Sequence, residues 1–560
     1  MYREGIENIL IHSIEKAVNA VLMDLKISPA SSASLKIELE IPKDKTHGDL
    51  ATNVAMRTSK LAGQPVLAFA GMIADKMKEA LGSSEVNAVI EKIEVKNPGF
   101  INFFFNKSYL YQVLLEIKRR KDDFGRSSIG RGIKLHLEFV SANPTGPLTI
   151  AHGRQAAIGD SLANILESLG YDVTREYYTN DEGTQMDILG NSIRVRYLEI
   201  CGMHEAFPQD GYKGSYVGDI AKAFKKKYKD RFTKTKDMGP FREFGLRWIL
   251  NDIKKDLKDF GVKFDIWYSQ KMLRRSGKIE KTIELLKKKG YIYEQEAATW
   301  FKSTAFGDDK DRVVIKSDGK FTYLAPDIAY HLDKYRRQFK KIIDIWGPDH
   351  HGYVPRMKAA IKALGFSSDS LEVLIVQLAT LHKSGAQVSM STRAGEFVTL
   401  REVMDEVGKD VSRFCFIMRR LSSHLDFDLD VVKKQSMENP VYYIQYAHAR
   451  IWSILEHGKS VKLFTKFNSG LLKEPEELEL LRVLRQFPMM AVLSGKTMEP
   501  YVILQYLQDL AAIFHSFYTK HRVVGNDPYL TRARLVLVDC VRIVLANGLR
   551  LLGVSLPKKM

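Results

Sequence analysis

The chain has 560 residues, 45% of them hydrophobic and 27% charged, a composition that excludes a disordered polymer and predicts a multidomain globular protein. It has no run of about 18 apolar residues, so we expect no membrane-spanning helix. Its three isolated cysteines predict neither a disulfide framework nor a zinc cluster. The N-terminus lacks the apolar core of a signal peptide, so we expect a cytoplasmic protein.

The net charge of +18 indicates a polyanionic partner, most simply nucleic acid. Lysine and arginine favour such partners because they neutralise phosphates. An ordinary basic surface would give the same excess, so charge alone leaves both interpretations open.

Residues 1 to about 118 predict a separate small α/β module. Its landmarks are two turns, His47-Gly48-Asp49 and Pro98-Gly99-Phe100. A charged stretch and then a Ser/Gly-rich stretch follow, which indicates a linker. We therefore expect a second domain from about residue 130.

Residues 133–178 are the most informative stretch of the chain. Apolar and polar residues first alternate with the period of a strand, and two prolines and a glycine then interrupt regular structure over 141–148. Apolar residues recur at helical spacing as far as Leu169, and an extended pattern resumes at Tyr171. This order predicts a βαβ unit of a parallel sheet.

His152 lies in the first turn of the predicted helix. Ligands of parallel sheets bind beyond the carboxyl ends of the strands, where helix N-termini present free N–H groups. The stretch can therefore hold the phosphates of a nucleotide, with His152 beside them. A core histidine satisfied by the backbone is the alternative for a lone His.

A long insertion is predicted to split the sheet. Residues 185–310 are charged and mostly helical, and strand patterns return at Lys341–Trp346 and Leu371–Val376. We therefore expect a Rossmann-like parallel-sheet domain over about 130–435.

The C-terminal part, from about residue 438 to the end, is helical throughout in its pattern. Residues 441–560 carry 16 Lys and Arg against 9 Asp and Glu. This predicts a basic helical bundle.

The loop from Ser384 to Leu400 is the second informative site, because it is rich in hydroxyl side chains and contains Arg393. A mobile loop with a cation and hydroxyls can close on a triphosphate as charge develops in a transition state. Taken alone, such a loop is more often structural.

Together the two sites are specific. Residues 143–154 resemble the HIGH motif, and residues 389–393 resemble the KMSKS motif, of class I aminoacyl-tRNA synthetases. A closer resemblance, in order along essentially the whole chain, is to arginyl-tRNA synthetases of the bacterial type. The segments that carry it are residues 138–148, 323–331, 346–352, 439–450 and 546–554.

This resemblance implies a fold of three parts and a reaction. Residues 1–118 are similar to the family's additional domain, which contacts the tRNA elbow. Residues 130–435, with the helical insertion at 185–310, are similar to its Rossmann-like catalytic domain, and residues 438–560 to its all-α anticodon-binding bundle. The implied reaction forms arginyl-adenylate from L-arginine and ATP with Mg²⁺ and passes the arginyl group to tRNA(Arg). A monomer without zinc or a membrane partner is expected.

The resemblance also implies site residues. A guanidinium group needs a carboxylate, and Asp327 is the first choice for that role; the alternative is that Asp327 caps the following helix. Tyr323 is expected to line the same pocket, and Asn143 and Glu138 to contact the amino acid. Asp349 reaches the pocket in some family members. The implied ATP-binding and catalytic residues are Asn143, Pro144, Thr145, Gly146, Thr149, His152, Gly153, Met390, Ser391, Thr392 and Arg393.

Tyr442, Tyr446 and Arg450 share one face of a predicted helix. Aromatic side chains beside arginine can stack on unpaired bases, whereas packing in the core is the alternative. Tyr446 and Arg450 are the residues we expect to bind the anticodon stem. The adjacent His350 and His351 diverge, so we predict no metal site there.

Two departures from the motifs affect phosphate chemistry. Thr149 stands in place of the first histidine of the HIGH motif and cannot carry charge. Ser389 and Thr392 stand in place of the KMSKS lysines, so Arg393 or Lys383 is the expected substitute cation. A different nucleotidyl transferase of the HIGH superfamily and a non-catalytic RNA-binding regulator are the alternative functions.

Overall fold

The computed structural model describes residues 6–28, 37–42, 44–81, 88–383, 386–387, 397–428, 432–433, 439–459 and 467–560. The chain forms two compact units, each assembled from separated stretches of sequence. The first unit comprises Met1–Asp122, Ile454–Gln486 and Ile513–Val544, and the second comprises Asp123–Ser453, Phe487–Ala512 and Leu545–Met560.

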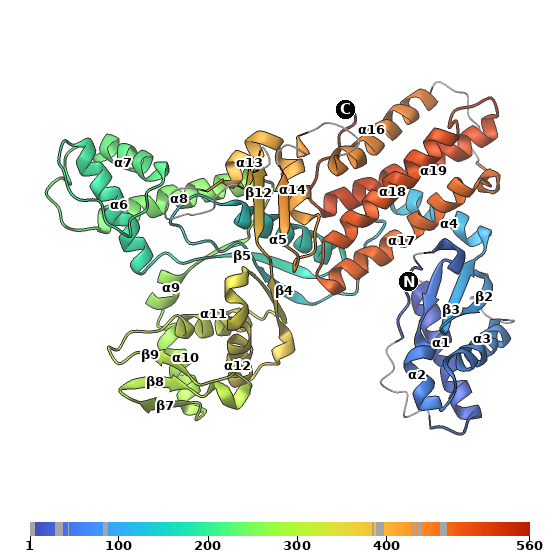
Figure 1. Cartoon of the computed structure of the whole chain (residues 1–560), viewed down its shortest axis with the longest axis horizontal. Helices are drawn as coiled ribbons and strands as arrows, with labels where there is room; N and C mark the ends of the chain where they lie inside the picture. Colours follow the sequence, from blue (N-terminus) through green and yellow to red (C-terminus); the bar gives the residue numbers. More distant parts are fainter. Residues whose placement is uncertain are drawn as a thin grey trace. The chain divides into compact units, whose positions relative to one another are not determined.

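The N-terminal part of the first unit is a small α/β module on a three-stranded antiparallel sheet (Figure 1). In this sheet β3 (Phe100–Phe105) lies between β1 (Leu50–Thr52) and β2 (Ile90–Lys96). Ile101 and Phe103 on the central strand are fully buried. The helices of this part are α1 (Ile6–Asp24), α2 (Val54–Ala62), α3 (Val66–Leu81) and α4 (Lys107–Arg120).

The two turn landmarks of this module require glycine. Gly48 has a φ of +92°, and a Cβ there would lie 2.7 Å from the carbonyl oxygen of Phe103. Gly99 has a φ of +142°, and a Cβ there would lie 2.5 Å from Val66 Cγ1. Both turns are therefore shaped by close backbone packing that L side chains would prevent.

The second unit contains a five-stranded, all-parallel sheet in the order β11-β10-β4-β5-β6. Its strands are β4 (Lys134–Glu138), β5 (Asp172–Thr179), β6 (Ile266–Ser269), β10 (Lys341–Trp346) and β11 (Leu371–Ile375). The helix α5 (Ile150–Ser168) connects β4 to β5, which confirms the predicted βαβ unit. Because the strand order reverses between β4 and β10, the carboxyl ends of these two strands flank the switch point at which such sheets bind ligands.

The region 185–310 is mostly helical, as predicted, but it also contributes a strand to the main sheet. Figure 1 shows α6 (Thr184–Ile200), α7 (Ser215–Tyr228) and α8 (Gly239–Asp259) gathered as one helical group. The chain then returns to the sheet as β6, whose four residues are all half-buried and so give no alternating pattern. After β6 come α9 (Gln270–Arg275), α10 (Lys278–Lys288) and an antiparallel sheet of β7 (Ile292–Gln295), β8 (Ala298–Phe301) and β9 (Arg312–Ile315).

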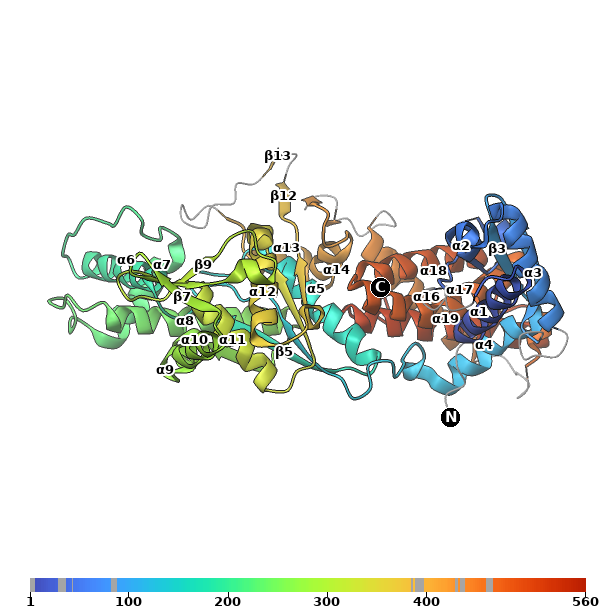
Figure 2. The same ribbon diagram turned by 90° about the horizontal axis from the view of Figure 1, so that it is seen from below.

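The second unit also contains helices and a small sheet that follow β9 in the chain. Figure 2 shows β12 and β13 extending beyond α13. In the small third sheet of this unit, β12 pairs with both β13 and β14. The elements are α11 (Leu324–Arg336), α12 (Val354–Leu364), β12 (Ala379–Lys383), β13 (Ala386–Gln387), α13 (Leu400–Val407), α14 (Lys409–Ile417) and β14 (Leu425–Asp428).

The C-terminal part is helical, and the described residues from 439 onward contain no strand. Parts of its helices belong to each of the two units. No helix in the described part of the chain is long and apolar enough to cross a membrane. The helices are α16 (Pro440–Gly458), α17 (Pro475–Thr497), α18 (Tyr501–Lys520) and α19 (Pro528–Leu551).

Candidate active site

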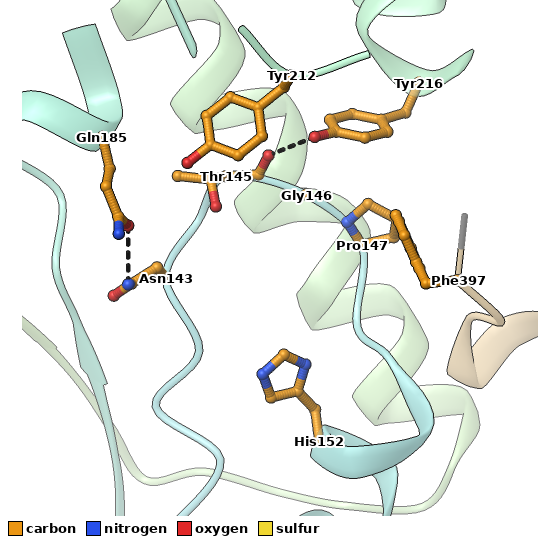
Figure 3. Close-up of a pocket in the computed structure, with 9 residues that line it drawn as sticks. All are labelled: Asn143, Thr145, Gly146, Pro147, His152, Gln185, Tyr212, Tyr216 and Phe397. Carbon is orange, nitrogen blue, oxygen red and sulfur yellow. Dashed lines mark hydrogen bonds between the residues drawn. The ribbon is translucent and has the colours of Figure 1, made fainter. Parts of the chain in front are cut away.

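A pocket of about 220 Å³ lies beyond the carboxyl end of β4, where the chain turns into α5 (Figure 3). Its wall comes from the loop after β4, from residues in and before α6 and α7, and from the segment that enters α13. It therefore lies at the edge of the sheet where the topology predicts ligand binding. The lining residues are Asn143, Thr145, Gly146, Pro147, His152, Gln185, Tyr212, Tyr216 and Phe397.

The ring of His152 faces this pocket from the first turn of α5 (Figure 3). Its Nδ1 accepts a hydrogen bond from the main-chain N–H of Thr149 at 3.2 Å. Because that N–H can only donate, the neutral imidazole carries its proton on Nε2. Burial lowers the pKa of His152 to about 4, so the ring is neutral at pH 7. His152 can thus offer one uncharged N–H donor to a phosphate oxygen.

Thr149, which departs from the HIGH motif, begins the helix. It is the N-cap of α5, with an extended backbone at φ −89° and ψ 172°, and it is only 6% exposed. Its hydroxyl oxygen lies 3.2 Å from His152 Nδ1. Threonine therefore takes a position that suits a helix cap and orients the adjacent histidine.

The segment that enters α13 pairs directly with the start of α5. The N–H of Leu400 donates to the carbonyl of Leu148 at 2.8 Å, and Thr399 forms an antiparallel bridge with Thr149. Phe397 lines the pocket just before this contact. The flank of the second motif thus meets the first motif. The predicted residues Met390, Ser391, Thr392 and Arg393 lie outside the described residues, as does Ser389.

The helical region 185–310 holds the loop after β4 in place. The Tyr216 hydroxyl donates to the carbonyl of Thr145 at 2.7 Å. A Cβ at Gly146 would lie 3.1 Å from the same hydroxyl oxygen, so a side chain there would press against this contact. The Tyr216 side chain therefore holds the loop through the main chain of Thr145.

Asn143 is fixed from the same direction. Its Nδ2 donates to Gln185 Oε1 at 2.9 Å, and both side chains line the pocket. Pro144 is buried beneath the loop. Sequence reasoning missed Gln185, Tyr212 and Tyr216, because they belong to the predicted insertion and no motif marks them.

Asp327 lies in the first turn of α11. The N-cap of that helix is Tyr323, so the alternative prediction that Asp327 caps the helix is wrong. Burial raises the pKa of Asp327 to about 6. The Tyr353 hydroxyl donates to its Oδ2 at 2.6 Å and opposes this rise, while the nearby charge of Glu138 adds to it. A cation arriving at this carboxylate would favour its ionised form.

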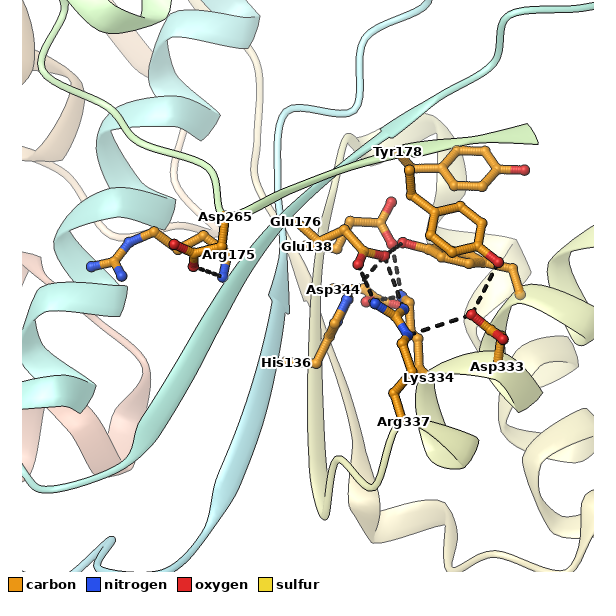
Figure 4. A network of polar contacts seen from close by, with 12 residues as sticks. His136, Glu138, Arg175, Glu176, Tyr178, Asp265, Asp333, Lys334, Arg337 and Asp344 are labelled. Carbon is orange, nitrogen blue, oxygen red and sulfur yellow. Dashed lines mark hydrogen bonds and ion pairs between the residues drawn. The ribbon is translucent and has the colours of Figure 1, made fainter. Parts of the chain in front are cut away.

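Three carboxylates form a row across the parallel sheet (Figure 4). In the strand registers Asp344 on β10 pairs with Glu138 on β4, and Glu138 pairs with Glu176 on β5. Side chains at paired positions of neighbouring strands point to the same face of a sheet. Three like charges at this spacing would repel one another unless cations lay among them.

One of these cations is Lys334, a fully buried lysine of α11. Its Nζ donates to Glu138 Oε2 at 2.7 Å and to Asp344 Oδ1 at 2.8 Å. His331 adds a contact of 2.8 Å between its Nε2 and Asp344 Oδ2. Burial alone would raise the pKa of Asp344, but the Lys334 charge lowers it below its usual range. Glu138 is thus held by a fixed, buried cation.

Arg337, the C-cap residue of α11, neutralises the third carboxylate. Its Nη1 and Nη2 donate to Glu176 at 2.5 and 3.1 Å. Burial opposes ionisation of Glu176, but contacts with His136 and Arg337 lower its pKa to about 2. Removing one partner of a buried ion pair typically costs about 3–5 kcal/mol, so loss of any one member of this network should destabilise the fold.

The other predicted arginine-binding residues are on the surface. Tyr323 is 76% exposed. Asp349 is exposed on the 3-10 helix η5 (Pro348–Tyr353), the helix that also supplies Tyr353 to Asp327. The structure therefore places η5 beside Asp327 through its last residue.

The residues predicted to bind the anticodon stem lie on α16. The rings of Tyr442 and Tyr446 stack with centroids 6.0 Å apart and an interplanar angle of 13°. Arg450 is half-buried on the same helix. His350 and His351 are both exposed. Across the described part of the chain, no group of three or more His, Cys, Asp or Glu side chains could hold a metal ion.

Comparisons with known proteins identify the family of this chain. Three family models match in order: the arginyl tRNA synthetase N terminal domain over residues 8–105, the class I (R) tRNA synthetase catalytic domain over 119–415, and the DALR anticodon binding domain over 444–560. The arginine–tRNA ligase of Bacillus subtilis is 44% identical over 100% of this chain and 99% of its own length. The chain belongs to the arginyl-tRNA synthetase family.

Other members of the family give the same picture. The arginine–tRNA ligase of Geobacillus kaustophilus is 48% identical over 93% of this chain and 94% of its own length. The solved arginyl-tRNA synthetase of Thermus thermophilus shares the fold, with a TM-score of 0.77 at 20% identity, covering 98% of this chain and all of its own. The solved Plasmodium falciparum arginyl-tRNA synthetase also shares the fold, with a TM-score of 0.74 at 16% identity and complete coverage of both chains.

Proposed function

We propose that this protein ligates L-arginine to its cognate tRNA in two steps, through an arginyl-adenylate. The observation that carries this proposal is the likeness, over the full chain, to relatives named arginine–tRNA ligase. In the first step the arginine carboxylate attacks the α-phosphate of ATP, the bond to the β-phosphate oxygen breaks, and diphosphate leaves. In the second step a terminal ribose hydroxyl of the tRNA attacks the acyl carbon and releases AMP.

The start of α5 is the proposed nucleotide side of the site. Neutral His152 would donate from Nε2 to a phosphate oxygen, and Thr149 would hold the ring in that orientation. Thr145 and Gly146 would let the loop backbone approach the nucleotide, which we expect to enter as its Mg²⁺ complex. Pro144, Gly153 and the residues Met390, Ser391, Thr392 and Arg393 complete the proposed ATP-binding set.

The carboxylates at the end of β4 and on α11 are the proposed arginine side. Asp327 would bind the guanidinium, because a carboxylate matches its paired N–H donors. Glu138 would contribute charge to the same pocket, and Asn143 would contact the amino-acid end. Tyr323 and Asp349 would cover the pocket from the surface.

The tRNA would be bound by the other two parts of the chain. We propose that the N-terminal domain, residues 1–118, contacts the tRNA elbow and that the C-terminal domain, residues 438–560, reads the anticodon arm through Tyr446 and Arg450. The catalytic domain would span 130–435. We further propose that the enzyme acts as a monomer in the cytoplasm, where its tRNA substrate is used.

Diphosphate exchange into ATP tests this function. With tRNA present, exchange should depend on arginine and not on lysine or glutamate. Exchange with lysine or glutamate but not arginine would overturn the amino-acid assignment. Binding of tRNA without any adenylate formation would instead favour a non-catalytic RNA-binding protein.

A further inference from the structure

Arg154 is a fully buried arginine in the first turns of α5, two residues after His152. Its Nη1 donates to the carbonyls of Gln377 at 2.7 Å and Leu378 at 3.3 Å. Its Nη2 donates to the carbonyl of Arg420 at 3.0 Å. These acceptors belong to two separate segments, one that enters β12 and one that leads to β14.

The two segments are also joined to each other. The N–H of Gln377 donates to the carbonyl of Leu421 at 3.0 Å, and the N–H of Leu425 donates to the carbonyl of Leu378 at 3.2 Å. From there β12 and β14 run as a parallel pair. One planar guanidinium can bind several carbonyls in a fixed geometry, which the single ammonium group of lysine cannot reproduce. Arg154 thus links α5 to the segments that precede β12 and β14, at Gln377, Leu378 and Arg420; we call these segments the base of the β12–β14 pair.

The chain that follows β12 comes back to the same helix start. Leu400 and Thr399 bond to Leu148 and Thr149, as described above. A Cβ at Gly153 would lie only 2.8 Å from Leu400 Cδ1, so Leu400 packs closely over this turn. Residues 148–154 therefore hold both β12 and the start of α13.

We propose that Arg154 is a positioning residue for the nucleotide side of the active site. It fixes the position of β12 relative to the turn that carries His152. It does so by contacting main-chain oxygens, and it does not contact the substrate. This inference rests on the proposed function, because it gives the nucleotide side a role in adenylate formation. Burial lowers the pKa of Arg154 to about 10, so placing a cation here costs free energy that the contacts must offset.

Arg413 of α14 is a matched control in the same unit. It too is fully buried and donates mainly to main-chain oxygens: Nε to Leu552 at 3.1 Å and Nη1 to Phe260 at 3.2 Å. It also bonds to Asp160 at 2.6 Å. None of these acceptors belongs to the base of β12 or β14. Arg413→Lys therefore reproduces the loss of a buried guanidinium without disturbing the contact in question.

The test compares the full-length wild type, Arg154→Lys and Arg413→Lys by diphosphate exchange with arginine and tRNA, with Tm measured for each. We expect Arg154→Lys to lower kcat/KM for ATP by at least about tenfold while KM for arginine stays within about twofold. Arg413→Lys should lower Tm and leave kcat/KM for ATP within about twofold. Arg154→Gln, which carries no charge and keeps one amide donor, replaces the lysine variant if that variant does not fold.

ATP parameters of the Arg154 variant within twofold of wild type, or equal losses in the Arg154 and Arg413 variants, would overturn the inference. A wild type without arginine-dependent exchange would contradict the proposed function instead. In that case calorimetric titration of the same variants with ATP still decides the role of Arg154, since a weaker Kd in the Arg154 variant alone is the expected result.

Discussion

The two sides of the candidate active site are built by opposite means. The nucleotide side consists of a helix start, a glycine-containing loop and a neutral histidine, held by main-chain hydrogen bonds. The arginine side is dense in charge, with carboxylates from three strands and cations from one helix. A triphosphate brings its own charge and Mg²⁺, whereas a guanidinium must find carboxylates in the protein. We therefore expect the two sides to respond differently to mutation and to pH.

The largest expected effect follows loss of charge on the arginine side. Asp327→Asn should lower kcat/KM for arginine by at least about 30-fold, because truncating one partner of a buried charge pair costs about 2–5 kcal/mol. KM for ATP should stay within about threefold. Steady-state exchange at varied arginine and at varied ATP measures both. The control is Tyr353→Phe, which removes the hydrogen bond to Asp327 but keeps the charge of its carboxylate. If Tyr353→Phe lowered kcat/KM for arginine as much as Asp327→Asn, the charge of Asp327 would not be what binds arginine.

The next effect is on the nucleotide side. If Arg393 replaces the missing KMSKS lysine, Arg393→Ala should cut the rate of adenylate formation by at least about tenfold and change arginine binding far less. Single-turnover formation of arginyl-adenylate measures this rate. Turnover within about threefold of wild type, equal to about 0.65 kcal/mol, would refute the substitution, and Lys383→Ala would then be the variant to compare.

Loss of an aromatic ring on α16 should weaken the binding of tRNA and leave the chemistry of arginine activation unchanged. Tyr446→Ala should raise KM for tRNA by about tenfold, since stacking of one base contributes about 1–3 kcal/mol. Exchange at saturating tRNA should be unchanged. Tyr442→Phe keeps the stacked ring and serves as the control. An unchanged KM for tRNA in Tyr446→Ala would instead indicate that this ring only packs.

The smallest expected effect is a difference in pH dependence between the two sides of the site, which can be measured on the wild-type protein. Asp327 has a pKa of about 6 and must be ionised to bind a cation, so kcat/KM for arginine should fall as pH drops below 6, approaching tenfold per unit. His152 has a pKa of about 4 and stays neutral between pH 5.5 and 8, so KM for ATP should follow only the ionisation of the nucleotide phosphate, with no step from the enzyme. A parallel fall in both quantities would contradict the distinction.

The local structure around His152 could be predicted from the sequence more readily than the carboxylate row on the arginine side. The strand, loop and helix around His152 are local in the chain, so period and turn residues are enough to place them. The row of Glu138, Asp344 and Glu176 depends on strand register between distant segments, which no local pattern reveals. The sequence does contain a signal for this network. Acidic residues interrupt strands that are otherwise apolar, and Lys334 lies among apolar residues of its helix.

Other elements were missed for similar reasons. The strand β6 is too short and too evenly exposed to show a period. Tyr216 and Gln185 reach the pocket from the helical region, where their role is set by a tertiary contact with the loop after β4. The helical region 185–310 thus contributes side chains to the wall of the candidate pocket.

Proton release on binding shows whether an ionised Asp327 receives the guanidinium of arginine. Calorimetric titration with arginine in buffers of different ionisation enthalpy gives the number of protons released. With a pKa of about 6 for Asp327, we expect release of about half a proton per arginine at pH 6, almost none at pH 8, and none from Asp327→Asn at either pH. Equal proton release by the wild type and Asp327→Asn at pH 6 would contradict this role of Asp327.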